Sequence, residues 1–261
     1  MGDSGIRVAA RFSKMFTSVK FDVMAEHFLQ PTPATARIAR MKNPETPESG
    51  WRGSPDVWLQ AAHDLLVENG IDAVRILPLA KRLNIARTSF YWHFKDRETL
   101  LAALADRWAA RTTAGLIAAT TAYADTKAEA MLNLTSCFLD DTAFDSRLEF
   151  AIRTWALTDP ALAKTLAAAD ATRIAAIKTM FLRFGYPDAE ADIRAHTVYL
   201  TQIGYISMRV DEPLLPRLDR IPPYALTFTG HAPSAAEVKS FRDRHIKAGH
   251  LQASRMSKSS S

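Results

Sequence analysis

The feature that most limits how this chain can fold is a run of short helical segments with separate stop signals between Ser54 and Leu101. Ser54 is a good N-cap residue, and the proline after it suits the first helical position. Apolar residues then recur at helical spacing until Gly70 supplies a left-handed stop. A short second helix, 76–83, is expected to end at Asn84, because asparagine tolerates the left-handed region.

The next segment, 87–93, is a second short helix after a tight turn, and Asp96 is placed to cap a long helix behind it. This order of elements is that of a helix-turn-helix, whose second short helix enters the DNA major groove. Within the stretch RTSFYWHF, the i, i+4 spacing of Phe90 and Phe94 predicts that both rings face inward and anchor on Trp58. The other side chains of the stretch then face outward.

The rest of the chain also favours helices. Ala and Leu are abundant, only 10 of 261 residues are Gly, and the long Ala/Leu stretches lack alternating β-branched residues. We therefore predict an all-α protein with further helices at about 126–140, 144–157, 160–184 and 188–208, and one last, weaker helix at about 234–249. The expected division is an extension or linker (1–50), a three-helix helix-turn-helix domain (51–101), a helical bundle (102–211) and a proline-punctuated segment with a disordered tail (212–261).

Composition excludes several kinds of protein. Cys137 is the only cysteine, which excludes an internal disulfide and multi-cysteine metal sites and fits a reducing compartment. No apolar run approaches the length of a membrane span, and no metal site or cofactor is expected. A glycine-rich phosphate loop, a nucleophile elbow and a His-Glu metal helix are all missing, so an enzyme is not expected. The net charge of +5 permits nucleic-acid binding without requiring it.

The segment GIDAVRILPLAKRLNIARTSFYWHFKDRETLLAAL resembles the DNA-binding domain of the TetR family of bacterial repressors. The resemblance covers about residues 54–101, and RTWALTDPALA and DAEADIRA resemble the C-terminal half of such regulators more loosely. It implies an all-α homodimer. A small N-terminal domain would bind a palindromic operator on double-stranded DNA, and a divergent helical bundle would hold the dimer interface and a small-molecule effector.

Carried over by position, the resemblance also implies which side chains touch DNA. Arg87 and Thr88 fall where family members reach base edges, and an arginine fork can bond guanine O6 and N7 together. Tyr91 and His93 match phosphate-contacting positions, and Arg97 matches a cation at the start of the following helix. The full expected set is Arg75, Arg87, Thr88, Ser89, Tyr91, Trp92, His93 and Arg97.

Two departures from the family pattern bear on specificity. Arg75 stands where Ser or Thr often caps the second helix, so it can serve a phosphate but not the cap. Leu77 occupies a place where some members use a polar side chain for base contact, which shifts base reading toward 87–93. Asn84 replaces the usual glycine of the turn at little cost.

The bundle should hold an effector pocket and a dimer interface. Aromatic side chains with polar tips, and a few polar groups beside them, are common in ligand sites, although each would equally fit a plain core. The expected lining is Trp108, Met131, Phe138, Phe150, Arg153, Trp155, His196, Tyr199 and Tyr205. Helices 160–184 and 188–208 form a hairpin, and two hairpins would make a four-helix bundle unless the apolar stripes pack only within one chain. The expected interface is Leu166, Ile174, Ile177, Phe181, Leu200 and Ile203.

Taken together, these patterns predict a cytoplasmic DNA-binding transcriptional regulator. A repressor released by an effector is the preferred hypothesis. The alternatives are a ligand-independent or architectural helix-turn-helix protein and, less favoured, an enzyme.

Overall fold

Helices account for the regular structure of the part of the chain that the computed structural model describes, residues 53–259, with side chains described for residues 53–247. The prediction of an all-α fold is confirmed. The predicted extension, residues 1–50, and the last two residues lie outside this range. In chain order, with η for a 3-10 helix, the elements are α1 (Pro55–Asn69), η1 (Ile71–Ala73), α2 (Ile76–Leu83), η2 (Arg87–Trp92), α3 (Arg97–Thr121), α4 (Lys127–Cys137), α5 (Ser146–Ala156), α6 (Pro160–Arg183), α7 (Asp188–Ser207), α8 (Leu214–Thr229) and α9 (Ala235–Ser259).

The predicted start and stop signals are confirmed at the first helices. The Ser54 side chain accepts a hydrogen bond from the Val57 N–H, and Gly70 ends α1 with a φ of 80°. Asn84 ends α2 in the left-handed conformation, with φ 52° and ψ 43°. Asp96 accepts a hydrogen bond from the Thr99 N–H and caps α3. Local chemistry therefore sets the boundaries of the helix-turn-helix.

Residues 212–259 contain more helix than predicted, since only one weak helix, at about 234–249, was expected there before a disordered tail. They contain α8 and α9, and α9 continues to Ser259, through most of the tail expected to be disordered. Two prolines lie inside α8, and each interior proline costs about 3 kcal/mol. Leu218, Ile221 and Phe228 are buried on the same helix, and each contributes about 1.5–3 kcal/mol. The two effects are of the same order, so packing against the bundle preserves a helix that the prolines disfavour.

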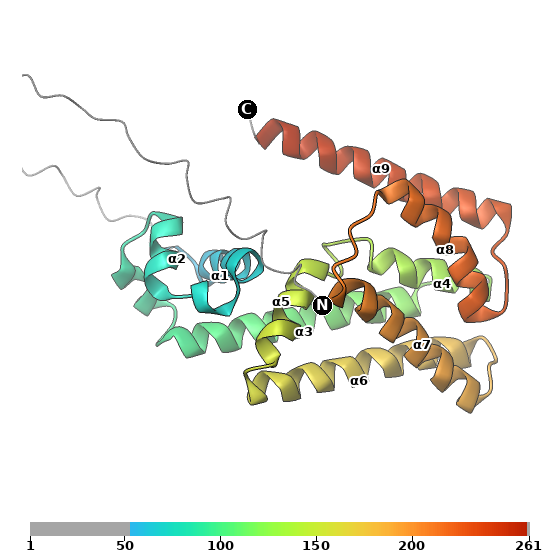
Figure 1. Cartoon of the computed structure of the whole chain (residues 1–261), viewed down its shortest axis with the longest axis horizontal. Helices are drawn as coiled ribbons and strands as arrows, with labels where there is room; N and C mark the ends of the chain where they lie inside the picture. Colours follow the sequence, from blue (N-terminus) through green and yellow to red (C-terminus); the bar gives the residue numbers. More distant parts are fainter. Residues whose placement is uncertain (1–52, 260–261) are drawn as a thin grey trace, which may run out of the picture. The chain divides into compact units, whose positions relative to one another are not determined.

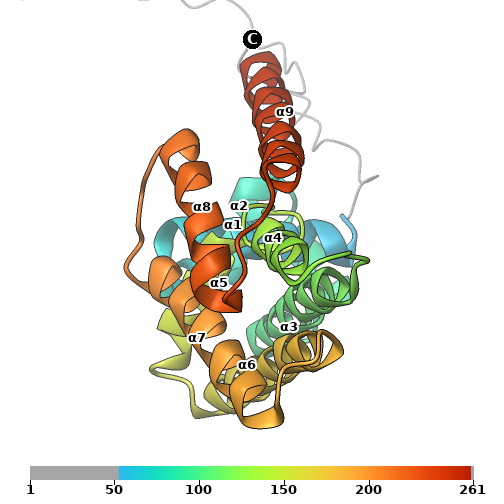
Figure 2. The ribbon, with the colours of Figure 1, turned by 90° about the vertical axis from the view of Figure 1, so that its right-hand side faces the viewer.

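Two hydrophobic cores hold the helices together (Figure 1). The first core joins α1, α2, η2 and the start of α3 to α5 and the start of α6. The second joins the end of α3 to α4, the end of α6, α7, α8 and α9, and Figure 2 shows α9 extending beyond the other helices. The boundary predicted at residue 101 falls inside α3. The helix-turn-helix therefore shares its core with the bundle through α3, α5 and α6.

An ion pair adds to this shared core. His63 on α1 lies with Nε2 2.8 Å from the Asp145 carboxylate and Nδ1 3.0 Å from the Asp64 carboxylate. Both ring nitrogens face acceptors, so the contacts are best satisfied by the doubly protonated ring. Asp145 also caps α5 by accepting hydrogen bonds from two backbone N–H groups. The histidine thus ties the helix-turn-helix to the first turn of α5.

This pair predicts a pH-dependent stability. The hydrogen bond to Asp145 raises the pKa of His63, burial opposes it, and Asp64 adds to the rise. Because the folded pKa exceeds the unfolded one, the stabilisation is complete below about pH 6.5 and is lost as the pH rises through the folded pKa. We expect the difference in unfolding free energy between wild type and His63→Gln to shrink as the pH rises from about 6 through the folded pKa of His63.

Urea unfolding across this pH range measures that difference. The stability of the variant has to be subtracted from that of wild type because a second histidine also titrates. Burial lowers the pKa of His245, so its contribution to the free energy of unfolding rises with pH and opposes that of His63. His196→Gln, at an exposed histidine on α7, is the matched control. A difference that stays constant with pH for His63→Gln would contradict the prediction.

Candidate DNA-binding interface and ligand cavity

The stretch RTSFYWHF separates into a buried face and an exposed face, as predicted. Phe90 is fully buried, and its ring meets Trp58 edge to face at 5.3 Å between centroids. Phe94 is also buried and lies 5.6 Å from Phe90. Tyr91 and Trp92 are 50% and 67% exposed. The buried rings thus fix the segment in place while its other face remains accessible.

The segment is a 3-10 helix, whereas an α-helix was expected over 87–93. The backbone N–H of Ser89 donates to the carbonyl of Ala86 at 2.9 Å, and that of His93 donates to Phe90 at 2.9 Å. Such tight turns are common in short segments. The tighter winding buries Ser89, which is only 8% exposed. Ser89 is therefore poorly placed for the DNA contact that was expected of it.

Arg87 and Thr88 are exposed at the start of η2. The Nη2 of Arg87 donates to the Tyr91 hydroxyl at 3.3 Å, one turn further along. This contact holds the guanidinium on the outer face and leaves its other N–H groups available for an acceptor. Arg75 is also exposed and makes no capping bond to α2, as predicted.

Arg97, predicted to contact phosphate, also makes hydrogen bonds within the protein. Its Nε donates to the Val74 carbonyl at 2.6 Å, and its Nη2 donates to the Ile71 carbonyl at 3.0 Å. Arginine has five N–H donors, and these two hold the turn between α1 and α2. The side chain thus satisfies backbone acceptors in the helix-turn-helix, a structural role that the sequence pattern did not indicate.

Two exposed lysines were not expected to contact DNA. Lys95 lies between the contact stretch and the cap of α3, and Lys81 lies on α2 one turn after Leu77. Leu77 itself is 67% exposed, in agreement with its predicted place outside the core. Clustering of basic residues around 75–97 was the available signal for these lysines, since phosphate contacts draw on any nearby cation.

Most of the residues expected to line an effector pocket are packed inside the protein. Met131, Phe138 and Trp155 are buried core residues. His196 is exposed and pairs with Asp192 on its own helix, with 3.5 Å between nitrogen and oxygen, so its assignment to the pocket is wrong. A buried pocket beside Trp108 holds only about 30 Å³, room for a water molecule rather than an organic ligand.

Trp108, Arg153 and Tyr199 instead belong to a buried polar network around Glu149. The Trp108 indole N–H donates to Glu149 at 2.8 Å, and Arg153 and Arg173 both pair with the same carboxylate, at 2.8 and 3.2 Å. Asp170 extends the network by accepting hydrogen bonds from Arg153 and from the Tyr199 hydroxyl, both at 2.6 Å. The network joins α3, α5, α6 and α7 and leaves no cavity for a ligand among these groups.

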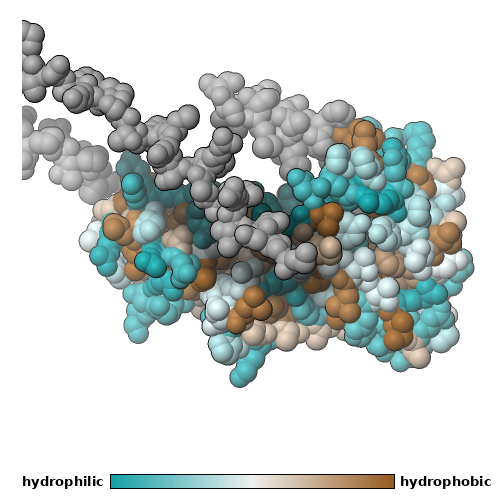
Figure 3. All heavy atoms as spheres, in the orientation of Figure 1, coloured by the Kyte–Doolittle hydropathy of each residue, from teal (hydrophilic) through white to brown (hydrophobic). Residues whose placement is uncertain are grey.

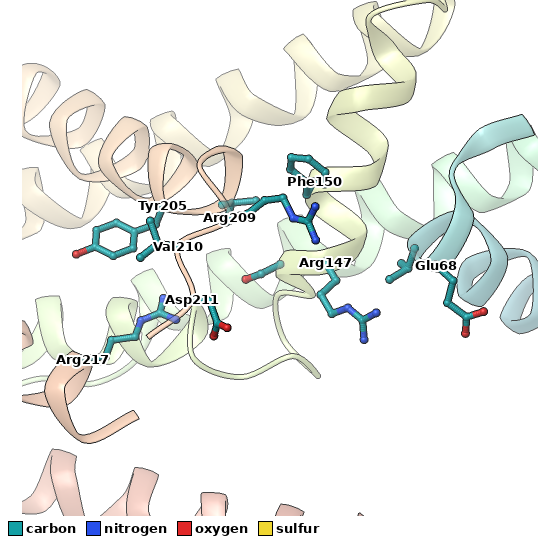
Figure 4. A pocket seen from close by; sticks show the side chains of 11 residues that line it. Glu68, Arg147, Phe150, Tyr205, Arg209, Val210, Asp211 and Arg217 are labelled. Atoms are coloured by element: carbon teal, nitrogen blue, oxygen red, sulfur yellow. The ribbon is translucent and has the colours of Figure 1, made fainter. Parts of the chain in front are cut away.

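A larger cavity lies elsewhere, between the C-terminal end of α1 and the helices α5, α7 and α8 (Figure 4). Its volume is about 340 Å³, at the lower end of the range for small-molecule sites. Of the expected pocket residues, Phe150 and Tyr205 line it. The lining comprises Val67, Glu68, Ser146, Arg147, Phe150, Tyr205, Ile206, Arg209, Val210, Asp211 and Arg217.

Some residues of the predicted dimer interface are buried within the chain, and others are exposed. Ile177 and Phe181 are buried within the chain, at 0% and 2% exposure, and are therefore unavailable to a partner. Leu166, Ile174 and Ile203 are half-buried against the two cores. Leu200 is 59% exposed and lies two turns from Ile193 on the same face of α7. Figure 3 shows separate hydrophobic spots over the part of the surface that α6 and α7 form.

Other kinds of site find little support. Burial raises the pKa of Cys137 to about 12, which disfavours a nucleophilic thiolate. Among residues 53–247, no cluster of three or more His, Cys, Asp and Glu side chains is arranged to hold a metal ion. None of the described helices is long and apolar enough to cross a membrane.

The N-terminal helix-turn-helix, which shares its core with a larger helical bundle, also matches known regulators in sequence. The model for bacterial regulatory proteins of the tetR family matches residues 59–104. The tetracycline repressor protein class A from transposon 1721 of Escherichia coli is 42% identical over 52 residues, 20% of this chain and 24% of that protein. The chain thus spans about a quarter of the length of this relative. Over residues 59–104, its N-terminal domain is thus similar to that of TetR-family regulators.

Solved structures extend the likeness to the bundle at the level of fold. A putative TetR-family transcriptional regulator from Rhodococcus sp. has a TM-score of 0.50 and 18% identity, with 67% of this chain and 96% of that one covered. The fatty acid degradation regulator FadR from Bacillus halodurans has a TM-score of 0.54 and 14% identity, with 70% and 97% covered. At these identities the bundle shares a fold, and its ligand has to be argued from its own residues.

Proposed function

We propose that this protein is a homodimeric repressor that binds a palindromic operator and is released from it by a small molecule. The observation that supports this most directly is the exposed face of η2, held in place by the buried rings of Phe90 and Phe94. A rigid segment with an outward arginine at its start suits the major groove. Action on DNA would place the protein in the cytoplasm.

The proposed contacts divide by role. Arg87 and Thr88 would read base edges, because they lie at the exposed start of η2. Arg75, Tyr91, Trp92 and His93 would contact phosphate and sugar, together with Lys81 and Lys95. Such contacts fix the register of a protein on DNA without reading sequence.

Release would depend on the distance between two recognition segments. Successive major grooves on one face of DNA lie roughly 34 Å apart, so a dimer must hold this spacing. An effector that binds better to a dimer of different spacing shifts the population away from DNA. The shared core of α1, α3 and α5 offers a direct mechanical path from the bundle to the helix-turn-helix.

Selection of genomic fragments by the purified full-length chain, followed by anisotropy titration at physiological salt, tests the proposal. We expect a palindromic sequence to bind about 1,000-fold or more tightly than random DNA. Equal affinity for all sequences would instead favour an architectural DNA-binding protein. Absence of DNA binding would defeat both.

Arg87→Ala should weaken operator binding by about 1–3 kcal/mol and relax the preference at one base pair, because a bidentate base contact is lost. Lys95→Ala should weaken binding to all sequences and lower the salt dependence by about one ion. Anisotropy titrations on operator and random DNA at several salt concentrations measure both effects. Arg244→Ala, at an exposed arginine on α9, is the control, and equal losses on both DNAs for Arg87→Ala would contradict its role.

Leu200→Glu should convert the dimer to monomers. Leu200 is exposed within one chain, so a charge there leaves the fold intact but is costly once the α7 face is buried against a partner. Ile203 is a poorer choice for this test because it also packs against the second core. Light scattering reports the mass, and Leu157→Glu, at an 84% exposed leucine after α5, is the matched control. A dimer that persists in Leu200→Glu would move the interface away from α7.

A further inference from the structure

The cavity between α1, α5, α7 and α8 carries more positive than negative charge. Arg147, Arg209 and Arg217 line it, against the carboxylates of Glu68 and Asp211. Within the described residues none of the three arginines forms an ion pair. Glu68 is already engaged, since both of its oxygens accept hydrogen bonds from Arg82 at 2.7 and 2.8 Å.

The unpaired cations are unevenly placed in the cavity. Figure 4 shows Arg147, Phe150 and Arg209 on the side nearer Glu68, with Tyr205, Asp211 and Arg217 on the other side. Burial lowers the pKa of Arg217, which marks a guanidinium that is poorly solvated. The negative charge of Asp141 opposes this fall and partly balances Arg217. Asp141 also acts on Arg147, which still forms no ion pair among the described residues, so the least compensated charge is that of Arg209.

Arg209 is held in place at a cost to the backbone. It follows the end of α7 with a φ of 51°, a left-handed conformation that helix ends normally assign to glycine. The Val210 N–H donates to the Tyr205 carbonyl at 3.1 Å and closes this turn. A bulky residue in this region costs on the order of 1 kcal/mol or more, and such outliers concentrate at functional sites. Its guanidinium lies 5.4 Å from the centre of the Phe150 ring.

Apart from Ser146 and the charged groups, the remaining walls are mainly aromatic and aliphatic. Phe150 and Tyr205 contribute aromatic rings, and Val67 and Ile206 contribute aliphatic groups. Ring faces of this kind accommodate planar ligands, while the arginine fork matches the two oxygens of a carboxylate. A volume of about 340 Å³ restricts the occupant to a small molecule.

We propose that this cavity binds a small aromatic carboxylate, with the carboxylate between Arg147 and Arg209 and the ring against Phe150. We further assign this anion as the effector, a step that rests on the regulatory function proposed above. Val67 and Glu68 belong to α1, and Glu68 holds α2 through Arg82, so the occupant touches the helix-turn-helix directly. Its binding would bias the position of α1 and α2 against α5 and α7.

Calorimetric titration of the full-length chain tests the site without DNA. The probes are benzoate, 4-hydroxybenzoate and phenylacetate, with benzamide as the neutral isostere and inorganic phosphate as the non-aromatic anion. We expect at least one carboxylate to bind and benzamide to bind at least about tenfold more weakly. Arg209→Gln and Arg147→Gln should each weaken the carboxylate about tenfold or more, as the loss of a charge-assisted hydrogen bond implies. Glutamine at position 209 also has a β-carbon, so the cost of the left-handed backbone conformation is the same in Arg209→Gln as in wild type.

Arg244→Gln is the matched control, since Arg244 is exposed on α9 and does not line the cavity. No binding of any carboxylate up to about 10 mM, an affinity too weak for a built site, would overturn the proposal. Equal binding of benzamide, tighter binding of phosphate, or unchanged affinity in both cavity variants would do the same.

Operator titration with and without the bound carboxylate tests the effector assignment separately. We expect the anion to change operator affinity at least about fivefold. Unchanged operator affinity would overturn the effector role but would not contradict the proposed binding site. Absence of DNA binding with normal anion binding would defeat the proposed function and spare the site.

Discussion

Glu149→Ala should lower the free energy of unfolding by about 3–5 kcal/mol, because it removes one partner from a buried ion network. Glu149 and Arg173 are both fully buried. Without the carboxylate, the charge of Arg173 and the Trp108 N–H lose their acceptor. The Nη2 of Arg173 already lacks a hydrogen bond among the described residues, so little compensation is at hand. Urea unfolding followed by circular dichroism measures the loss.

A double variant separates the cost of a lone buried charge from a general failure to fold. Replacing a buried ion pair by apolar side chains is often neutral or stabilising. Arg173 lies over the rings of Trp108 and Phe144, at 5.0 and 5.4 Å, so an apolar side chain suits its place. Glu149→Leu with Arg173→Met should regain most of the stability, since Arg153 and Asp170 still pair with each other.

Asp106→Ala, at an exposed carboxylate on α3, is the control and should change stability by less than about 0.5 kcal/mol. A loss under about 1 kcal/mol for Glu149→Ala would show that water or a rearranged partner replaces the carboxylate. A double variant no better than the single one would show that the site needs its charges for another reason.

The helix-turn-helix was predictable from sequence because its determinants are local. The Ser54 cap, the stops at Gly70 and Asn84, and the i, i+4 pair of Phe90 and Phe94 each act within a few residues. The pitch of η2 was not predictable, because both helix types place residues three apart near the same face and the segment is too short to separate the two periods. The hydrogen bonds of Arg97 to the carbonyls of Val74 and Ile71 span more than twenty residues and leave no local signal.

The bundle was harder to predict because its contacts are distant in sequence. Trp108, Arg153 and Tyr199 were singled out correctly as aromatic and polar groups in one region, but they satisfy one another around Glu149. A sequence pattern identifies amphipathic residues but does not show whether they line a cavity or pack against one another. The helix α8 was missed because the cost of a proline is local, whereas the burial that offsets it involves α4.

Phe90→Ala should destabilise the protein by about 3–5 kcal/mol, as expected for removal of a fully buried aromatic side chain. The ring packs against Trp58, Tyr91 and Phe94, so the truncation leaves a cavity between α1 and η2. Tyr91→Ala is the matched comparison on the same segment. Tyr91 is half exposed, and we expect its truncation to cost about 1 kcal/mol or less.

The two variants should differ most when stability and DNA binding are measured together. Tyr91→Ala should weaken DNA binding in a protein of nearly normal stability, because it removes a group from the exposed face and frees Arg87 from its 3.3 Å contact. Phe90→Ala should lose DNA binding in step with stability, and lowering the temperature should recover part of both. If Phe90→Ala were as stable as wild type, the buried rings would not be what holds η2 in position, and the division of this stretch into a core face and a DNA face would have to be abandoned.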